Sequence, residues 1–245
     1  FSNNNYEFEI RLGYFQEHFF KSDINFIKYK KLLNMDELYN KENETTEMIL
    51  VCKSINNIQK NISYKNYIPH ETTYRKKNRV NTINLNLLEC RLALSNEIDL
   101  KTSSEIFNDC FRFKDRVSRI STNGKWRYDF TKVYDLDIKN ENIKDIKQLL
   151  SNSNYHYEIE IEYIQELRTL NFQDIINILS MLKKNEYNNY KHLLKDIQNL
   201  FSNKIEYNRN IKKVPPHLLS FKKITNHLIT LNHTNINNIL TDYSI

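Results

Sequence analysis

Three glutamates in one strand-like segment form the most chemically suggestive pattern in the chain. Glu158, Glu160 and Glu162 alternate with large apolar residues across positions 157–163. Alternate residues of a strand share a face, so these carboxylates would stand in a row about 7 Å apart. At an effective dielectric near 20, two such charges repel by roughly 2 kcal/mol. The row is therefore either a solvated strand face or the wall of a cation site.

Glu7, Glu9 and Arg11 form a second charged row near the start of the chain. They alternate with apolar residues across positions 6–13, which predicts another strand with one polar face. Carboxylate oxygens suit hard divalent ions such as Mg²⁺ or Mn²⁺, and the histidines and cysteines of the chain show no zinc-ligand spacing. If the two acidic rows face each other, the sequence predicts a magnesium or manganese site between them.

Basic side chains alternate in the same manner on the strand-like segments of the chain. Those on polar strand faces are Arg11, Arg75, Arg91, Lys114, Arg116 and Arg127. Cations opposite a carboxylate-held metal would bind a triphosphate, because they neutralise the charge that spreads over its oxygens during phosphoryl transfer. Arg91 and Arg127 could equally be surface ion-pair partners, and Lys114 with Arg116 could form a solvated basic face.

Alternation of polar and apolar residues predicts the strands that position these groups. We expect strands at 6–13, 48–55, 62–68, 80–85, 88–97, 111–118, 126–133 and 157–163. The segment Thr122-Asn123-Gly124-Lys125 is typical of a hairpin turn. The polar stretch from His70 to Lys77 is expected to end one strand and turn toward the next.

Helical periods are fewer and lie mainly in the second half. We expect helices at Ser22–Leu33, at about 141–150 and after a cap at Asn171, with a further helical period from 187 to 201. The apolar strand faces can pack against such helices, which leaves the charged faces either solvated or lining a lumen. The sharper interpretation is an antiparallel barrel with a charged interior.

Composition narrows the class of protein. With 245 residues, 40% of them hydrophobic, the chain can bury a sizeable core, and its formal charge of +6 favours polyanionic partners mildly. Its two glycines exclude a glycine-rich phosphate loop, and its three cysteines are expected to be free thiols. No apolar run is long enough to span a bilayer, so we expect a soluble intracellular protein without a membrane partner.

With these elements in order, the sequence resembles the triphosphate tunnel metalloenzyme superfamily, and within it the metal-dependent RNA triphosphatases of fungal and large-DNA-virus mRNA capping. The resemblance covers about residues 6–163. It is carried by Glu7-x-Glu9, Leu94-Ser95-Asn96-Glu97, Lys114-x-Arg116, Asp129-x-Thr131 and Glu158-x-Glu160-x-Glu162. It implies an α+β fold, in which helices buttress an antiparallel eight-stranded barrel around a triphosphate tunnel. The composition also resembles that of amoebal giant viruses.

The resemblance implies a role for each matched residue. Glu7, Glu9 and Glu162 would hold Mg²⁺ or Mn²⁺ directly, while Glu160 and Glu158 would complete its shell or bind its waters. Lys114 and Arg116 would bind the γ-phosphate, joined by Arg75 from an adjoining strand. Glu97 would orient the attacking water. Asp129 and Thr131 would support the cationic side chains by hydrogen bonding.

The implied activity is removal of the γ-phosphate from 5′-triphosphate RNA, with nucleoside triphosphates as possible further substrates. Two alternatives stay open: a hydrolase of tripolyphosphate or another small triphosphate, and a silent module that binds polyphosphate or RNA ends. The chain has no Lys-x-Asp-Gly guanylyltransferase motif, so we expect the cap-adding partner downstream or in another protein. A viral protein of this kind would be expected in the virus factory of the host cytoplasm or in the virion.

The expected domain division follows from the same pattern. Residues 1–210 would form the tunnel barrel with its supporting helices. Residues 211–245, which are polar past Val214-Pro215-Pro216, would form a support segment or a linker toward a further domain.

Overall fold

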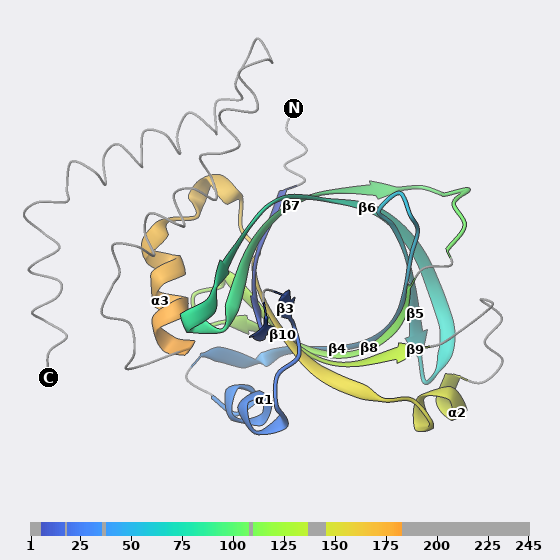
Figure 1. Ribbon diagram of the computed structural model, residues 1–245, viewed down its shortest axis with the longest axis horizontal. Coiled ribbons are helices and arrows are strands. Elements are labelled where there is room, and N and C mark those ends of the chain that lie inside the picture. Colours follow the sequence, from blue (N-terminus) through green and yellow to red (C-terminus); the bar gives the residue numbers. More distant parts are fainter. Residues whose placement is uncertain (1–5, 18, 36–37, 108–109, 137–145, 183–245) are drawn as a thin grey trace, which may run out of the picture. The chain divides into compact units, whose positions relative to one another are not determined.

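The computed structural model describes residues 6–17, 19–35, 38–107, 110–136 and 146–182 (Figure 1). Internal contacts divide the chain into two units, residues 1–167 and 168–245. The first unit contains a closed antiparallel barrel with the strand order β1-β10-β9-β8-β4-β5-β6-β7. This confirms the α+β class and the eight-stranded barrel. The predicted boundary after residue 210 lies outside the described residues and stays a prediction.

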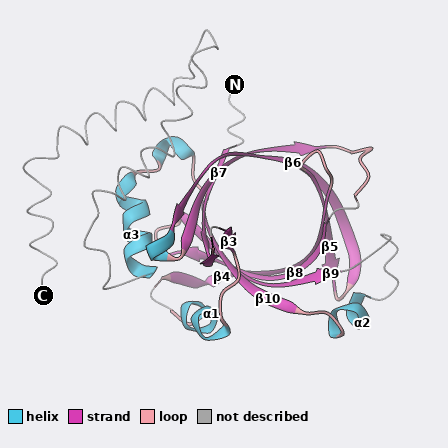
Figure 2. Cartoon of the chain, in the orientation of Figure 1, coloured by secondary structure: helices cyan, strands magenta, loops and turns pink. Residues whose placement is uncertain are grey.

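Strands dominate the described part of the chain (Figure 2). The barrel strands are β1 (Tyr6–Leu12), β4 (Tyr39–Lys53), β5 (Ile58–Lys65), β6 (Ile68–Leu85), β7 (Cys90–Leu100), β8 (Cys110–Ser121), β9 (Trp126–Leu136) and β10 (Tyr155–Tyr163). A separate two-stranded sheet holds β2 (Tyr14–Gln16) and β3 (Phe19–Lys21). The helices are α1 (Phe26–Leu33), α2 (Ile146–Ser151) and α3 (Phe172–Leu182), with 3₁₀ turns at Asn86–Leu88 and Leu167–Thr169.

The first and last barrel strands lie side by side. In the β1–β10 ladder Glu9 is paired with Glu162 and Arg11 with Glu160, whereas the other edge of β1 pairs with β7. Because β7, the last strand of the order, pairs with β1, the first, the sheet closes and leaves no free barrel edge. Closure therefore brings together two acidic rows that are about 150 residues apart in the sequence.

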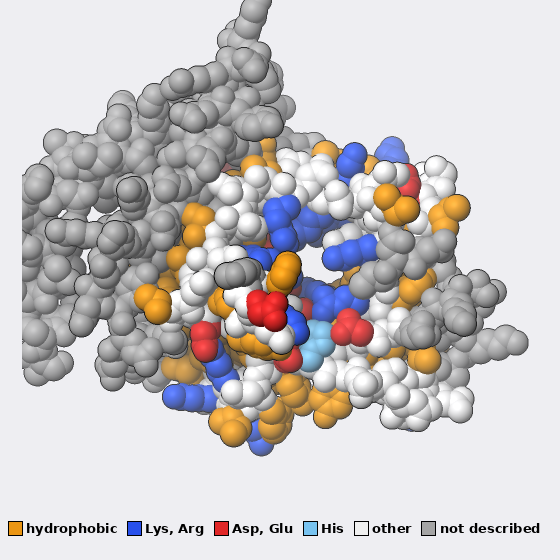
Figure 3. All heavy atoms as spheres, viewed as in Figure 1, with side chains coloured by type: hydrophobic (Ala, Val, Ile, Leu, Met, Phe, Trp, Pro, Cys, Tyr) orange, Lys and Arg blue, Asp and Glu red, His pale blue; other side chains and the backbone are white. Residues whose placement is uncertain are grey.

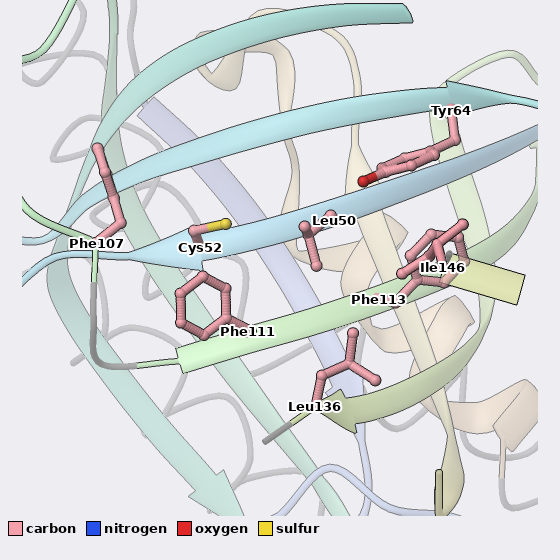
Figure 4. Packing of buried hydrophobic residues seen from close by; sticks show 8 residues of the cluster. All are labelled: Leu50, Cys52, Tyr64, Phe107, Phe111, Phe113, Leu136 and Ile146. Atoms are coloured by element: carbon pink, nitrogen blue, oxygen red, sulfur yellow. The ribbon is translucent and has the colours of Figure 1, made fainter. Parts of the chain in front are cut away.

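The apolar faces of the strands point away from the barrel interior and form the core there. One buried cluster joins Leu50, Cys52, Phe111, Phe113 and Leu136 to Ile146 of α2 (Figure 4). On β10, the ring of Tyr157 packs against Tyr29 of α1 with centroids 4.5 Å apart. The helices of the first unit thus cover hydrophobic surface that would otherwise face water, as burial of apolar area requires.

Strand β6 corrects the expectation of a turn between His70 and Lys77. It is continuous from Ile68 to Leu85, and the turn lies earlier, at Asn66 and Tyr67, both of which have positive φ. Successive positive φ values match the right-handed twist of a hairpin, so these two residues connect β5 to β6 directly. As a result Arg75 and Lys77 lie within the barrel wall.

Helix boundaries agree with the sequence in part. Helix α1 begins later than expected, because Asn25 rather than Ser22 or Asp23 caps it, accepting a hydrogen bond from the Lys28 amide at 2.8 Å. The predicted cap of α3 is confirmed: Asn171 Oδ1 accepts from the Asp174 amide at 2.7 Å. The helical period at 187–201 and residues 141–145 of the helix expected at 141–150 lie outside the described residues.

Two other sequence expectations concern thiols and membrane spans. Cys52 and Cys90 are buried and form no disulfide within the described residues, as expected, while the Cys110 side chain is outside the described set. Among the helices that the structure describes, none combines the length and hydropathy required to cross a membrane.

Gly13, directly after β1, is a position where any side chain would disturb this fold. A Cβ there would overlap the carbonyl oxygen of Lys21 and lie 2.7 Å from the ring of Phe20. We expect Gly13→Ala to lower the free energy of unfolding by at least about 2 kcal/mol, because backbone must move to make room. Chemical denaturation measures this loss.

Gly124 provides the matched control. It has φ +68 and open space around it, so Gly124→Ala meets only the conformational cost of about 1 kcal/mol. A Gly13→Ala protein as stable as the wild type would contradict the close approach of β1 and β3.

Candidate functional site

A cavity of about 930 Å³ occupies the interior of the barrel. All eight barrel strands contribute to its lining, and charged side chains ring its opening (Figure 3). Of the residues singled out from the sequence, those in the lining are Glu7, Arg11, Arg75, Glu97, Lys114, Arg116, Arg127, Glu160 and Glu162. The charged strand faces thus line a lumen instead of facing bulk water, which decides between the two interpretations of the acidic rows.

The Lys77 ammonium lies among the carboxylates of β1 and β7. Its Nζ is 2.6 Å from Glu97 Oε1, 3.1 Å from Glu7 Oε2 and 3.6 Å from Glu9 Oε2. Glu9 is almost completely buried, at 2% exposure. A buried carboxylate is stable only when a cation or hydrogen-bond donors compensate it, and Lys77 supplies both here.

Glu7 and Glu97 titrate as a linked pair. Burial raises the pKa of Glu7 to about 9, helped by its hydrogen bond with Glu97 and by the charges of Glu162 and Glu9, against the opposing effect of Lys77. Burial also opposes ionisation of Glu97, but hydrogen bonds with Glu7 and Lys77 lower its pKa to about 2. Near neutral pH, Glu7 therefore carries a proton that it shares with an ionised Glu97.

The β10 row is neutralised by arginines. Arg11 Nη2 lies 2.7 Å from Glu160 Oε1, and Arg127 Nη2 donates to Glu162 Oε2 at 2.5 Å. Although burial opposes ionisation, Arg11 and Lys114 lower the pKa of Glu160 to about 2. Burial raises the pKa of Glu162, and the nearby charges of Asp129 and Glu97 act in the same direction.

Strand β8 forms the basic wall of the lumen. Burial, together with the charges of Arg116 and Arg11, lowers the pKa of Lys114 despite the carboxylate of Glu160. Arg116 Nη1 is 3.0 Å from Glu47 Oε1 and 3.4 Å from Asp129 Oδ2. Its Nε is buried and has no hydrogen-bond partner within the described ranges. Arg116 therefore has one buried donor that the described side chains do not satisfy.

Asp129 and Thr131 differ in how they relate to this wall. Asp129 Oδ1 accepts from Ser118 Oγ at 2.7 Å and from Arg127 Nε at 2.9 Å, so it orients a cationic side chain, as expected from the sequence. The Oγ1 of Thr131 is buried without a partner in the part of the chain that the structure describes. The expected hydrogen bond from Thr131 to a cationic side chain is thus absent there.

Glu158 and Arg91 do not line the cavity, and neither does the buried Glu9, whose carboxylate contacts Arg11 and Lys77. Glu158 is fully buried, and its Oε1 accepts from Ser22 Oγ at 2.5 Å and from Arg112 Nη2 at 2.8 Å. Arg91 lies over the ring of Phe20, 4.5 Å from its centroid, and donates to Asn84 Oδ1. The structure therefore places Glu158 and Arg91 outside the cavity lining, and their expected roles at the metal and the phosphate stay predictions.

Lys77 and Arg112 are lining residues that the sequence analysis did not select. The signal for Lys77 was its spacing of two residues from Arg75, which places both on one face of a strand. Lys77 was not selected because a turn, and not a continuous strand, was expected at 70–77. Arg112 stands two residues before Lys114 on the same face, so alternation alone could have included it.

The carboxylates of this site are chemically suitable ligands for a divalent metal ion. Glu7, Glu9, Glu97 and Glu162 supply hard oxygen atoms. Burial and the neighbouring carboxylates together raise the pKa of Glu7, a cost that a cation would relieve. Among the residues that the structure describes, no group of three or more acidic, histidine or cysteine side chains is already arranged as ligands of one ion. Lys77, Arg11 and Arg127 contact these carboxylates instead.

The raised pKa of Glu7 makes the stability of the metal-free protein depend on pH. Protonated Glu7 stabilises the folded protein fully below pH 4.5, the ordinary pKa of a glutamate, and this stabilisation is lost as the pH rises toward about 9. With divalent ions chelated, we expect the melting temperature to fall between pH 5 and pH 9. Glu7→Gln mimics the protonated carboxyl, so it should flatten this dependence.

Glu17→Gln, at an exposed position, is the control and should retain the wild-type slope. Thermal unfolding by circular dichroism gives the comparison. Parallel curves for the wild type and Glu7→Gln would show that Glu7 is ionised in the folded protein.

No protein-family model and no curated protein matches the chain. Among solved structures, it is similar to the RNA triphosphatase domain of a trifunctional mimivirus mRNA capping enzyme, at 15% identity and TM-score 0.49 over 74% of this chain and 92% of that one. It is also similar to the S. pombe RNA triphosphatase Pct1, at 18% identity and TM-score 0.45 over 81% of this chain and 82% of that one. At these values the similarity by itself assigns no function.

Proposed function

We propose that this chain is a divalent-metal-dependent RNA 5′-triphosphatase that acts in the first step of mRNA capping. The observation that carries the proposal is the division of charge inside the closed barrel. Carboxylates of β1, β7 and β10 share the lumen with the basic wall of β8, including Lys114 and Arg116. An enclosed, polar cavity with both signs of charge suits a polyanion together with the cation that neutralises it.

In the proposed reaction, water attacks the γ-phosphorus of 5′-triphosphate RNA. The bond from this phosphorus to the β–γ bridging oxygen breaks, which releases inorganic phosphate and leaves a 5′-diphosphate end. That end is the substrate class for a guanylyltransferase, which we assign to a further segment or another protein. The cationic side chains stabilise the charge that develops on the γ-phosphoryl and leaving oxygens.

Glu7, Glu9 and Glu162 are the proposed ligands of Mg²⁺ or Mn²⁺, with Glu160 beside them. The pairing of Glu9 with Glu162 across the β1–β10 ladder supports this set. When bound, such an ion polarises the terminal phosphoryl group. We leave Glu158 out of the set because Ser22 and Arg112 already donate hydrogen bonds to one of its oxygens.

Lys114 and Arg116 are the proposed γ-phosphate ligands, with Arg75 opposite them on β6. Asp129 holds Arg116 in place through the 3.4 Å contact described above. Glu97 is the proposed acceptor for the attacking water, because its low pKa keeps it ionised at neutral pH. Arg75 Nη1, 2.6 Å from Glu97 Oε2, fixes that carboxylate toward the lumen.

Phosphate release from three substrates tests the proposal. The full chain is incubated with 5′-triphosphate RNA, ATP and tripolyphosphate, each with Mg²⁺, with Mn²⁺ and with chelator. We expect metal-dependent release from RNA, and we expect Arg116→Ala to lower kcat by about 100-fold or more, since it removes a donor to the developing charge. Lys65→Ala, at an exposed site outside the cavity lining, is the control and should retain full activity.

Each outcome separates the candidate functions. Hydrolysis of tripolyphosphate without hydrolysis of RNA would favour a small-triphosphate hydrolase. Binding of all three substrates without release would favour a binding module. Release that persists in chelator would contradict metal dependence.

Lys77 is expected to compete with the metal for the carboxylates that it contacts. Lys77→Met removes that positive charge, so we expect Mn²⁺ to bind about tenfold or more tightly in isothermal titration calorimetry, while the metal-free variant unfolds at a lower temperature. Lys76→Met, one residue away on the other face of β6, should bind Mn²⁺ as the wild type does. Weaker Mn²⁺ binding by Lys77→Met would mean that the lysine organises the ligands instead of competing.

A further inference from the structure

A strip of partly exposed aromatic rings lies outside the barrel, where β10 begins. We define the aromatic strip as Tyr155, Tyr157 and Phe26. The ring centroids of Tyr155 and Tyr157 are 5.7 Å apart, and those of Tyr157 and Phe26 are 5.3 Å apart. Tyr155 and Phe26 are each 50% exposed, so the strip presents ring surface to solvent and is not a closed core.

Lysine side chains accompany both ends of the aromatic strip. Lys132 Nζ lies 3.8 Å from the centroid of Tyr155, and Lys30 Nζ lies 5.5 Å from that of Phe26. Asp115, paired with Lys132 in the β8–β9 ladder, offsets part of this charge. Aromatic rings interleaved with ammonium groups are suited to stacked bases and the phosphates that link them.

The aromatic strip adjoins the rim of the cavity. His156 follows Tyr155 on β10, and its Nε2 lies 3.0 Å from Arg112 Nη2. Arg112 lines the lumen. Because neighbouring strand residues face opposite sides, a chain that leaves the lumen past Arg112 and His156 reaches Tyr155 by crossing one strand end. Figure 3 shows hydrophobic and basic side chains gathered on the same face as the opening.

We propose that the aromatic strip binds the single-stranded RNA that follows the 5′-triphosphate. This proposal rests on the proposed function, and it deepens it by assigning recognition of the polynucleotide to a surface outside the lumen. Stacking tolerates any base, so the strip confers preference for RNA chains over small triphosphates without sequence specificity. The lysines make that preference sensitive to salt.

The double variant Tyr155→Ala/Phe26→Ala tests the strip in the full chain. For a triphosphate RNA of twelve nucleotides we expect KM to rise tenfold or more with kcat unchanged, since each stacked base contributes a factor of about 5 or more. For tripolyphosphate we expect both constants to match the wild type. Ile106→Ala, a truncation at a residue that is 73% exposed, is the control for loss of surface apolar area.

A second measurement does not depend on hydrolysis. Fluorescence anisotropy follows binding of a 5′-hydroxyl RNA of twelve nucleotides at low salt, and the double variant should bind it tenfold or more weakly than the wild type. If no triphosphate is hydrolysed by the wild type, the proposed function fails, while this measurement still tests the strip.

Three results would overturn the proposal for the strip. The first is equal binding of 5′-hydroxyl RNA by the wild type and the double variant. The second is an equal rise in KM for RNA and tripolyphosphate, which would mean that the strip only supports the barrel. The third is unchanged RNA binding with altered self-association in sedimentation velocity, which would make the strip a contact between two copies of the chain.

Discussion

An enclosed lumen cannot hold many charges of one sign, and this electrostatic constraint governs the interior of the barrel. The carboxylates of β1, β7 and β10 are each matched by a cation from another position in the wall, such as Lys77 for Glu97 and Arg11 for Glu160. Removing water from an unpaired charge costs several kcal/mol, so neither set would be stable in the lumen alone. The balance holds the lining together and keeps it receptive to a charged ligand.

Because of the same constraint, this barrel has a polar interior and an apolar outer surface, the reverse of a barrel with an apolar interior. Because polar side chains fill the lumen, the apolar residues of the strands must find partners on the outer side. Helices α1 and α2 provide these partners through residues such as Tyr29 and Ile146. The helices of the first unit are therefore part of what allows the strands to present charge inward.

The charges that line the lumen are not equally neutralised by their neighbours, and this inequality shifts the pKa values of Glu7 and Lys114. Burial raises the pKa of Glu7, and the charges of Glu162 and Glu9 act in the same direction, whereas burial lowers the pKa of Lys114, assisted by the charges of Arg116 and Arg11. The charged form of each group is therefore under electrostatic strain in the lumen. A cation near Glu7 and an anion near Lys114 would relieve both strains, which is the pairing that a metal-bound triphosphate supplies.

Strand alternation by itself determined the polar faces, the acidic rows around Glu9 and Glu160, and the basic row at Lys114, because side-chain direction in a strand depends on local geometry alone. Tertiary structure decided what alternation cannot. Pairing of β1 with β10 set which rows meet, and a two-residue turn at Asn66 and Tyr67 brought Lys77 into the wall. Glu158, which accepts hydrogen bonds from Ser22 and Arg112, is buried outside the cavity lining. These outcomes depend on contacts between residues far apart in sequence. The alternation of residue types along one strand does not determine which distant residues it will contact.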